Sequence, residues 1–162
     1  MWLRTASKDD LQSIHQLLSK TIHATLDDLI SVSFADQLVE DQFTLDSLRK
    51  ALYHPSSEFI IADDGERIHG AAHATLGGVK TEPEVVALHF LAVDPESQRG
   101  GVGRKLLIEI EESFNVARRI RTHIFEKNLK ALKFFENQGY NKLSEKAKKL
   151  NLPVVVMEKS IF

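Results

Sequence analysis

The chain of 162 residues contains no cysteine. Without cysteine the protein can have no disulfide framework, no thiolate metal site and no cysteine nucleophile to carry an acyl group. Any group-transfer chemistry must therefore be direct or use another nucleophile. A hydrophobic content of 43% over this length suits one ordinary domain, residues 1–162, that buries its own core.

Long apolar runs are also missing. No run approaches the roughly 18 residues of a membrane span. The start of the chain, MWLRTASKDDL, has no apolar segment of the kind that a signal peptide needs. The sequence therefore predicts a cytoplasmic protein without a membrane partner.

The net charge is only −2, but the two signs are unevenly distributed along the chain. Before Gln98 there are 7 basic and 16 acidic residues, and from Gln98 onward there are 14 basic and 7 acidic residues. The basic residues of the second part are dispersed among apolar positions with helical spacing, without interleaved aromatic residues or a nucleic-acid-binding motif. We therefore expect solvated helix faces and one small anionic ligand, and no nucleic-acid partner.

Apolar periodicity predicts an α/β protein in which a strand, a glycine-rich turn and a helix form a crossover unit. The segment Thr21–Thr44 carries no recognisable motif. Helical spacing begins at Lys8, Thr44, Leu106 and Leu129. The predicted strands are Trp2–Thr5, the hairpin Glu58–Leu76 with Asp64 and Gly65 at its turn, Glu84–Val93, Ile120–Phe125 and Leu152–Ile161.

The glycine-rich turn stands in the stretch VDPESQRGGVGRKLLIEI, residues Val93–Ile110. Its glycines, Gly100, Gly101 and Gly103, let the backbone approach a ligand closely, and the start of the following helix leaves N–H groups unpaired. The positive end of the helix dipole adds to their attraction for an anion. A plain glycine-rich turn with solvated basic residues gives the same pattern, so this stretch alone leaves both interpretations open.

Two familiar phosphate-binding motifs are excluded at this turn. A Walker loop needs Lys and then Ser or Thr after its last glycine, whereas Gly103 is followed by Arg104, Lys105 and Leu106. The dinucleotide fingerprint fails because Leu106 occupies its third glycine position. Arg99, Arg104 and Lys105 would instead add charge-assisted bonds to a phosphate held by another kind of loop.

The segment LAVDPESQRGGVGRKLL resembles the acyl-CoA signature of the GNAT superfamily of N-acetyltransferases. That signature follows the pattern Gln/Arg-x-x-Gly-x-Gly/Ala, which Gln98, Gly101 and Gly103 match. Downstream, NLKALKFFENQGY resembles the second motif of the family, and the element order agrees over nearly the whole chain. The residues in register with the second motif are Asn128, Ala131, Phe134, Phe135, Gly139 and Tyr140.

The resemblance implies a GNAT-like fold, with a mixed, mostly antiparallel central sheet of about seven strands that is splayed in the middle and flanked by helices. It implies acetyl-CoA as co-substrate, with its pyrophosphate on the loop and its pantetheine arm paired along the strand like an added strand. The N–H of Leu91 would bind the thioester oxygen. The residues implied at the coenzyme are Leu91, Ala92, Val93, Gln98, Arg99, Gly100, Gly101, Val102, Gly103, Arg104, Asn128, Ala131 and Phe135.

Several of these residues have simpler roles as well. Asn128 would serve as an ordinary N-cap of the helix beginning at Leu129, with or without a bond to the pantetheine arm. Phe134 is expected in the core. Phe135 departs from the family pattern, because many members carry at this position a tyrosine that protonates the leaving thiolate. A phenyl ring has no proton to give, so solvent would protonate the coenzyme thiolate.

Two histidines are candidates for the residue that takes the proton from the amine, and the sequence does not decide between them. Family members use a glutamate at the position of Ala87 or at the position of His123. His123 is therefore one candidate. His89 is the second, because two-residue periodicity puts it on the same strand face as Leu91.

The resemblance implies an N-acetyltransferase that moves acetyl from acetyl-CoA to a primary amine by direct attack, and it is compatible with a homodimer. The Phe135 departure keeps open a catalytically silent coenzyme-binding sensor or interaction module.

His69 and His73 share a strand face but lack a third ligand, so we predict no metal. The segment Lys142–Lys149 is interpreted as a solvated link that can shape the acceptor site. The acidic set, interpreted as surface that could attract a cationic acceptor, is Asp27, Asp28, Asp36, Glu40 and Asp41.

Overall fold

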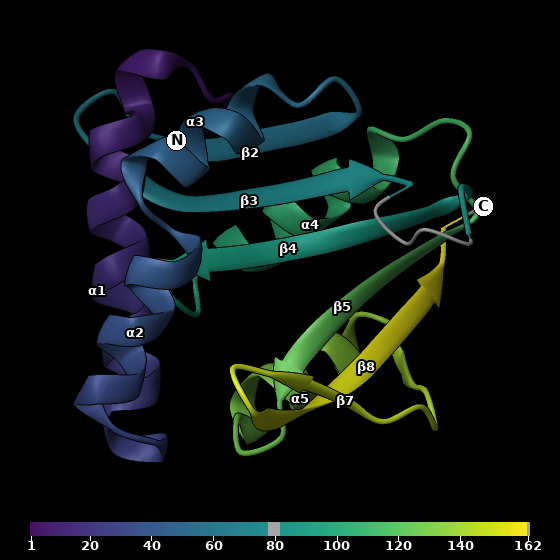
Figure 1. The fold of residues 1–162 in the computed structure, drawn as a ribbon. Helices are drawn as coiled ribbons and strands as arrows, with labels where there is room; N and C mark the ends of the chain where they lie inside the picture. Colours follow the sequence, from purple (N-terminus) through teal and green to yellow (C-terminus); the bar gives the residue numbers. More distant parts are fainter. Residues whose placement is uncertain (78–81, 162) are drawn as a thin grey trace.

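The computed structural model describes residues 1–77 and 82–161, which form an eight-stranded sheet with helices on both faces (Figure 1). The strand order is β1-β2-β3-β4-β5-β8-β6, and β7 pairs with β8. The strands are β1 (Trp2–Thr5), β2 (Ser57–Asp63), β3 (Ile68–Leu76), β4 (Val85–Val93), β5 (Arg119–Phe125), β6 (Asn141–Lys142), β7 (Ala147–Lys149) and β8 (Leu152–Ser160). The helices are α1 (Leu11–Leu29), α2 (Val32–Gln42), α3 (Leu45–Tyr53), α4 (Val102–Glu112) and α5 (Leu129–Asn137), with short 3-10 helices η1 (Lys8–Asp10) and η2 (Pro95–Ser97).

The pairing confirms the expected mixed, mostly antiparallel α/β architecture. Only β4 and β5 run parallel among the strand pairs of the described residues, and the crossover between them contains α4. None of the helices in the described ranges is long and apolar enough to cross a membrane.

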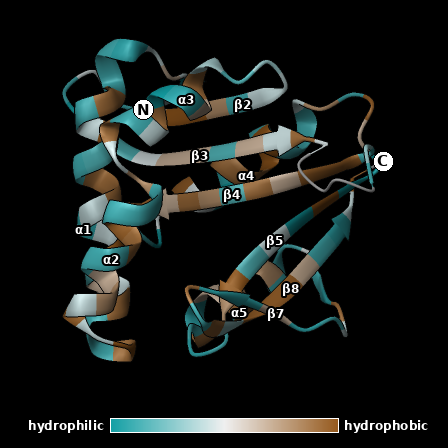
Figure 2. Ribbon diagram, viewed as in Figure 1, coloured by the Kyte–Doolittle hydropathy of each residue, from teal (hydrophilic) through white to brown (hydrophobic). Residues whose placement is uncertain are grey.

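Both faces of the sheet are buried, which explains the continuous apolar runs in its central strands. In β2, Phe59 and Ile61 belong to the buried cluster that includes residues of α1, α2 and α3, whereas Ile60 and Ala62 belong to the cluster that includes residues of α4 and α5. Figure 2 shows the hydrophobic colouring concentrated in the strands between these two helical layers. Gly70 in β3 allows α4 to pack closely, because a Cβ there would lie 2.9 Å from Leu106 Cδ1.

The segment Thr21–Thr44, which carries no recognisable sequence motif, is mostly helical. It contains the second half of α1 and all of α2. The N-cap of α2 is Ser31, whose side chain accepts a hydrogen bond from the Phe34 N–H (3.0 Å). Thr44 caps α3 in the same way through the Ser47 N–H (3.1 Å). These caps satisfy N–H groups that the first turn leaves unpaired, and they let α1, α2 and α3 follow one another within a short stretch of chain.

A β-bulge in β4 changes which side chains share a face. His73 pairs with Phe90 and Ala74 pairs with Leu88, so His89 is an additional residue in β4. As a result Leu91 packs toward α4 and α5, while the His89 ring stacks on His73 with centroids 4.9 Å apart. The prediction that His89 and Leu91 share a face was therefore wrong, because the extra residue interrupts the alternation.

The sheet opens between β4 and β5. These strands pair only from Val85 to Leu88 and from Arg119 to Thr122. At the last paired position the Thr122 hydroxyl donates to the Leu88 carbonyl (3.2 Å). Beyond this point β5 follows β8 and diverges from β4, as Figure 1 shows. The predicted splay is confirmed, and it leaves the second half of β4 without a strand neighbour on its β5 side.

Candidate functional site

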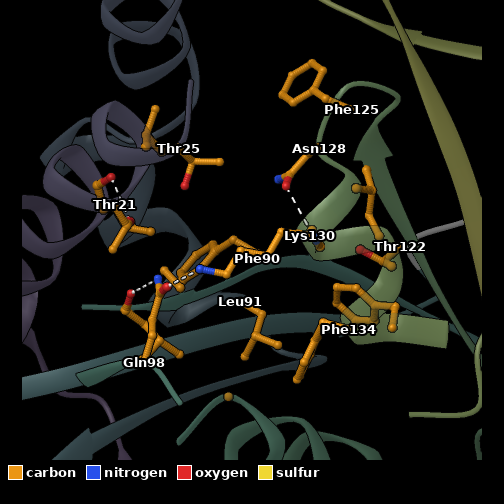
Figure 3. Close-up of a pocket in the computed structure, with 18 of the residues that line it drawn as sticks. Thr21, Thr25, Phe90, Leu91, Gln98, Thr122, Phe125, Asn128, Lys130 and Phe134 are labelled. Atoms are coloured by element: carbon orange, nitrogen blue, oxygen red, sulfur yellow. Dashed lines mark hydrogen bonds between the residues drawn. The ribbon is translucent and has the colours of Figure 1, made fainter. Parts of the chain in front are cut away.

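A cavity of about 560 Å³ occupies the opening between β4 and β5. One part of its wall comes from the face of the sheet covered by α4 and α5, and another part comes from the face covered by α1 and α2. Figure 3 shows Thr21 and Thr25 of α1 across the opening from Phe125 and Asn128. The cavity therefore connects the two faces through the sheet.

The glycine-rich loop forms one end of this cavity. Arg99 and Gly101 both have left-handed backbone conformations, with φ of 72° and 82°. A Cβ on Gly101 would meet no atom within 4 Å, so the loop leaves open space at this point. In the described part of the chain, no hydrogen bond is donated by the backbone N–H groups from Gln98 to Gly103. Such a loop at a helix N-terminus, with alternating backbone handedness, is suited to hold an anion.

Ion pairs and hydrogen bonds anchor the segment before the loop. The buried Asp94 accepts hydrogen bonds from Lys20 (3.1 Å) and Arg67 (3.4 Å). Next to it, Ser97 Oγ lies 2.6 Å from His69 Nδ1, whose other ring nitrogen lies 2.5 Å from Asp64 Oδ2. These contacts fix η2 against α1 and the hairpin of β2 and β3, so the start of the loop is held in place.

Gln98 links the loop to both walls of the opening. Its Nε2 donates to the Val93 carbonyl at the end of β4 (3.0 Å), and its Oε1 accepts from the Lys130 ammonium of α5 (3.0 Å). Lys130, Arg99 and Arg104 all line the cavity. The loop end of the cavity is therefore strongly basic.

The N-terminus of α5 provides the opposite wall. The Asn128 side chain accepts from the Ala131 N–H (3.2 Å), so Asn128 is the N-cap of α5, and its amide NH₂ can still donate. Asn128, Ala131, Phe134 and Phe135 all line the cavity. A Cβ at Gly103 would lie 3.6 Å from the Phe134 ring, so α4 and α5 meet closely at this point.

Residues 23–161 match the family model described as the acetyltransferase (GNAT) domain. The chain belongs to the GNAT acetyltransferase family. Acetyl-CoA is the co-substrate of this family, and the match confirms the interpretation of the two sequence motifs.

Solved GNAT structures share the fold over nearly the full chain. The PaiA N-acetyltransferase of Thermoplasma acidophilum, in complex with coenzyme A, is 16% identical over 98% of each chain, with a TM-score of 0.86. An acetyltransferase from Thermus thermophilus is 21% identical over 98% of this chain and 96% of its own, with a TM-score of 0.73. The ribosomal-protein-alanine N-acetyltransferase of Brucella melitensis is 19% identical over 99% of each chain, with a TM-score of 0.70.

In this GNAT chain the two phenylalanines of the second motif both line the cavity, but they are buried to different degrees. Phe134, expected in the core, is only partly buried, whereas Phe135 is 6% exposed. The Phe135 ring contacts the ring of Tyr140, with centroids 5.1 Å apart. The Tyr140 hydroxyl donates to Glu111 (2.9 Å), and Tyr140 does not line the cavity. Within the described residues, therefore, no tyrosine side chain lines this opening.

His123 and His89 both line the cavity on the face covered by α1 and α2. The two rings are open to the cavity but surrounded by protein elsewhere, and this burial lowers the pKa of each below its usual value. The nearby charge of Lys149 lowers both pKa values further. Thr75 Oγ1 lies 2.7 Å from His89 Nε2 and fixes the orientation of this ring. Both histidines are therefore neutral at pH 7 and able to accept a proton.

His73 lies beneath His89 and has no access to the cavity. It is 6% exposed, and burial lowers the pKa of its imidazole to about 3, so the ring is neutral. His69 is bonded to Ser97 and Asp64, as described above. Among the described residues there is no group of three or more metal-ligating side chains that could hold an ion.

The sequence analysis did not predict one residue that lines the cavity near His89 and His123. Lys149, placed in a solvated link, is instead the last residue of β7, is half-buried and lines the cavity. Its pairing with Leu152 follows from the turn at Leu150 and Asn151, both with positive φ (48° and 65°). Asn tolerates the left-handed backbone of a tight turn. Asn151, two residues after Lys149, is therefore the signal in the sequence that could have indicated a turn and the strand before it.

None of the five acidic residues suggested as an attraction for a cationic acceptor lines the cavity. Asp27 and Asp36 bind the two ring nitrogens of His23 (2.7 and 3.0 Å), which joins α1 to α2. Asp28, Glu40 and Asp41 are exposed. Their interpretation as surface residues is confirmed, and the walls of the cavity carry none of these negative charges.

Proposed function

We propose that residues 1–162 form a single N-acetyltransferase domain that moves the acetyl group of acetyl-CoA directly to a primary amine. The observation that carries this proposal is the continuous cavity through the splayed sheet. A coenzyme entering from the side of α4 and α5 and an amine entering from the side of α1 and α2 can meet beside β4. With no cysteine in the chain, an acyl-cysteine intermediate is excluded.

The loop residues supply what a pyrophosphate requires. The N–H groups from Gln98 to Gly103 would donate to its oxygens, and Arg99, Arg104 and Lys130 would add charge-assisted bonds. The free side of β4 from Leu91 to Val93 would pair with the pantetheine arm. The Gln98 amide now bonded to the Val93 carbonyl would give up that position to the arm, and Asn128 would donate to the arm through its free NH₂.

In the reaction the amine nitrogen attacks the thioester carbonyl carbon, a C–N bond forms and the C–S bond breaks. The Leu91 N–H would stabilise the negative charge that develops on the carbonyl oxygen. A neutral His123, directly or through a water, would accept the proton that the amine loses, with His89 as the second candidate. The thiolate leaves with a pKa of about 8.5 and takes its proton from solvent, because Phe135 has none to give.

The departure at Phe135 also supports one alternative, a coenzyme-binding module without turnover. Free thiol released from acetyl-CoA across a panel of amino acids, polyamines, aminoglycosides and peptide N-termini separates the two. We expect release that depends on one acceptor class. Coenzyme A binding without release above the hydrolysis rate for every acceptor would favour the silent module. A cytoplasmic location, a homodimer and the absence of a nucleic-acid partner remain predictions from the sequence and the resemblance.

A further inference from the structure

The acceptor half of the cavity is mainly apolar and built from fixed aromatic contacts. Phe90 packs edge-on against Phe43, with ring centroids 5.6 Å apart, and Phe125 packs in the same way against Phe34 at 5.4 Å. The two hydroxyls on this side come from Thr21 and Thr25. The apolar residues that line this half are Leu18, Ile22, Leu26, Leu38, Phe43, Phe90 and Phe125. An amine that binds here must therefore carry an apolar body.

No carboxylate lines the cavity in the described ranges, whereas four cationic side chains do. Arg99, Arg104 and Lys130 belong to the loop end, where the coenzyme phosphates are proposed to bind. Lys149 is separate from them. It pairs with Leu152 of β8, and Val156 of the same strand pairs with His123. Because paired residues share a face and Leu152 and Val156 are an even number of residues apart, Lys149 lies on the same face as His123.

The Lys149 ammonium has no hydrogen bond or ion pair with any residue of the described chain. The carboxylate whose charge acts on it is that of the exposed Asp41, which does not line the cavity. Burial lowers the pKa of Lys149, and the attraction of Asp41 offsets this only in part. A half-buried ammonium beside two histidines is destabilised unless an anion accompanies it. In the proposed reaction the acceptor reaches this face, so the acceptor itself can provide that anion.

We propose that the acceptor is an apolar amino acid whose carboxylate pairs with Lys149 while its side chain packs against Phe43, Phe90 and Phe125. The inference rests on the proposed acetyl transfer and names its substrate class. The α-amine would then lie beside His89 and His123, which face the same part of the cavity. A polyamine or an aminoglycoside would instead place additional ammonium groups near Lys149 with no carboxylate in the wall to receive them.

The test compares amino acids with carboxamides of the same side chain, which lack the carboxylate, and adds spermidine as a polycation. Thiol release from saturating acetyl-CoA is measured with L-leucine and L-phenylalanine, with their carboxamides, and with spermidine. The parent enzyme should prefer each carboxylate over its carboxamide by about tenfold or more in kcat/KM, as expected for a hydrogen bond to a charged group. Spermidine should be the poorest acceptor.

The variant Lys149→Met keeps the length of the side chain but removes its charge. It should abolish the preference for the carboxylate, mainly by raising the KM of the amino acid, and leave the KM of acetyl-CoA unchanged. Lys148→Met is the matched control, because the neighbouring residue of β7 points to the opposite face, is exposed and does not line the cavity. It should behave as the parent does.

The outcomes separate the inference from the proposed function. Transfer to carboxamides or spermidine as fast as to amino acids overturns the inference alone, and so does a carboxylate preference that survives in Lys149→Met. If no acceptor in the full amine panel releases thiol, the proposed function fails, and the inference fails with it.

Discussion

His123 occupies a position where GNAT relatives can carry a glutamate, and its surroundings suit the same task. Burial and the charge of Lys149 lower its pKa, Glu145 opposes this, and Arg121 lowers it further. His89, on the neighbouring strand, is subject to the charge of His123 as well. A histidine in these surroundings is neutral over a wide range of pH and ready to accept a proton.

We expect His123→Gln to lower kcat/KM for the amine by roughly ten- to a thousandfold near pH 7. The pH profile provides the specific test. Only the neutral imidazole accepts a proton, so activity of the parent should fall as the pH drops below the lowered pKa of His123, under about 6.5. This fall at low pH is the lower limb of the profile of kcat/KM against pH. It is distinct from the limb at higher pH, which the deprotonation of the amine substrate produces. In His123→Gln the lower limb should disappear, while acetyl-CoA affinity stays nearly constant.

His89→Gln is the comparison on β4. It removes the hydrogen bond with Thr75 and the stacking on His73, and it leaves His123 in place. A profile that loses its lower limb only in His89→Gln would transfer the role to His89. If both variants keep the profile of the parent, neither histidine accepts the proton.

The sequence predicted the chemical types at the site better than the orientations of individual residues. Of the loop glycines, Gly101 and Gly103 line the cavity together with Asn128, because their motifs are local, and their contact with the coenzyme remains a prediction. The orientation of His89 depends on a one-residue bulge that pairing with β3 creates, and no local pattern reports this pairing. The deeper burial of Phe135 compared with Phe134 arises from the packing of α5 against α4 and Tyr140, which adjacent positions in a helix cannot indicate.

At the level of elements, Asn128 caps the start of α5 and is also the proposed donor to the pantetheine arm. Asn128→Asp keeps a side-chain oxygen for the Ala131 N–H, and Asp caps helices about as well as Asn. It replaces the NH₂ donor with a negative charge facing the proposed pantetheine arm. We therefore expect an unchanged melting temperature and a rise in the KM of acetyl-CoA of about tenfold.

Asn128→Ala supplies the contrast. It removes both the cap and the donor, so thermal unfolding should show a loss of about 1 kcal/mol of stability together with the weaker coenzyme binding. If Asn128→Asp binds acetyl-CoA as the parent does, Asn128 acts only as a cap. Calorimetry and steady-state kinetics on the same two variants give both quantities.

The elements predicted from the sequence were those with long periodic patterns and clear ends. The helices α1, α3, α4 and α5 and all the strands except β6 and β7 fall in this group. The helix α2 escaped because its hydrophobic residues are few and only the Ser31 cap separates it from α1. The strand β7 escaped because its three residues include two lysines, and only pairing with β8 makes it a strand.

For the whole molecule, the proposed function depends on the splay of one sheet, because the two substrates would meet in the opening that it creates. The bonds between β4 and β5 hold the sheet together as far as Leu88 and Thr122, and beyond them the opening joins its two faces. The charge asymmetry along the chain fits this arrangement. All four cationic residues of the cavity come from the basic part of the sequence, and the acidic part supplies wall residues from α1, α2 and β4 but, in the described ranges, no carboxylate. In the proposed function, the one small anionic ligand expected from composition is the coenzyme bound at the loop.

The most direct test of this account is the affinity for coenzyme A when Gly101 is replaced by Asp or by Asn, measured by titration calorimetry. Both side chains tolerate the left-handed backbone at this position, and a Cβ there meets no atom within 4 Å, so the two variants differ mainly in charge. Gly101→Asp should weaken binding by about ten- to a hundredfold more than Gly101→Asn, since it places a negative charge beside the pyrophosphate. A folded Gly101→Asp protein that binds coenzyme A as tightly as the parent would contradict the assignment of the loop.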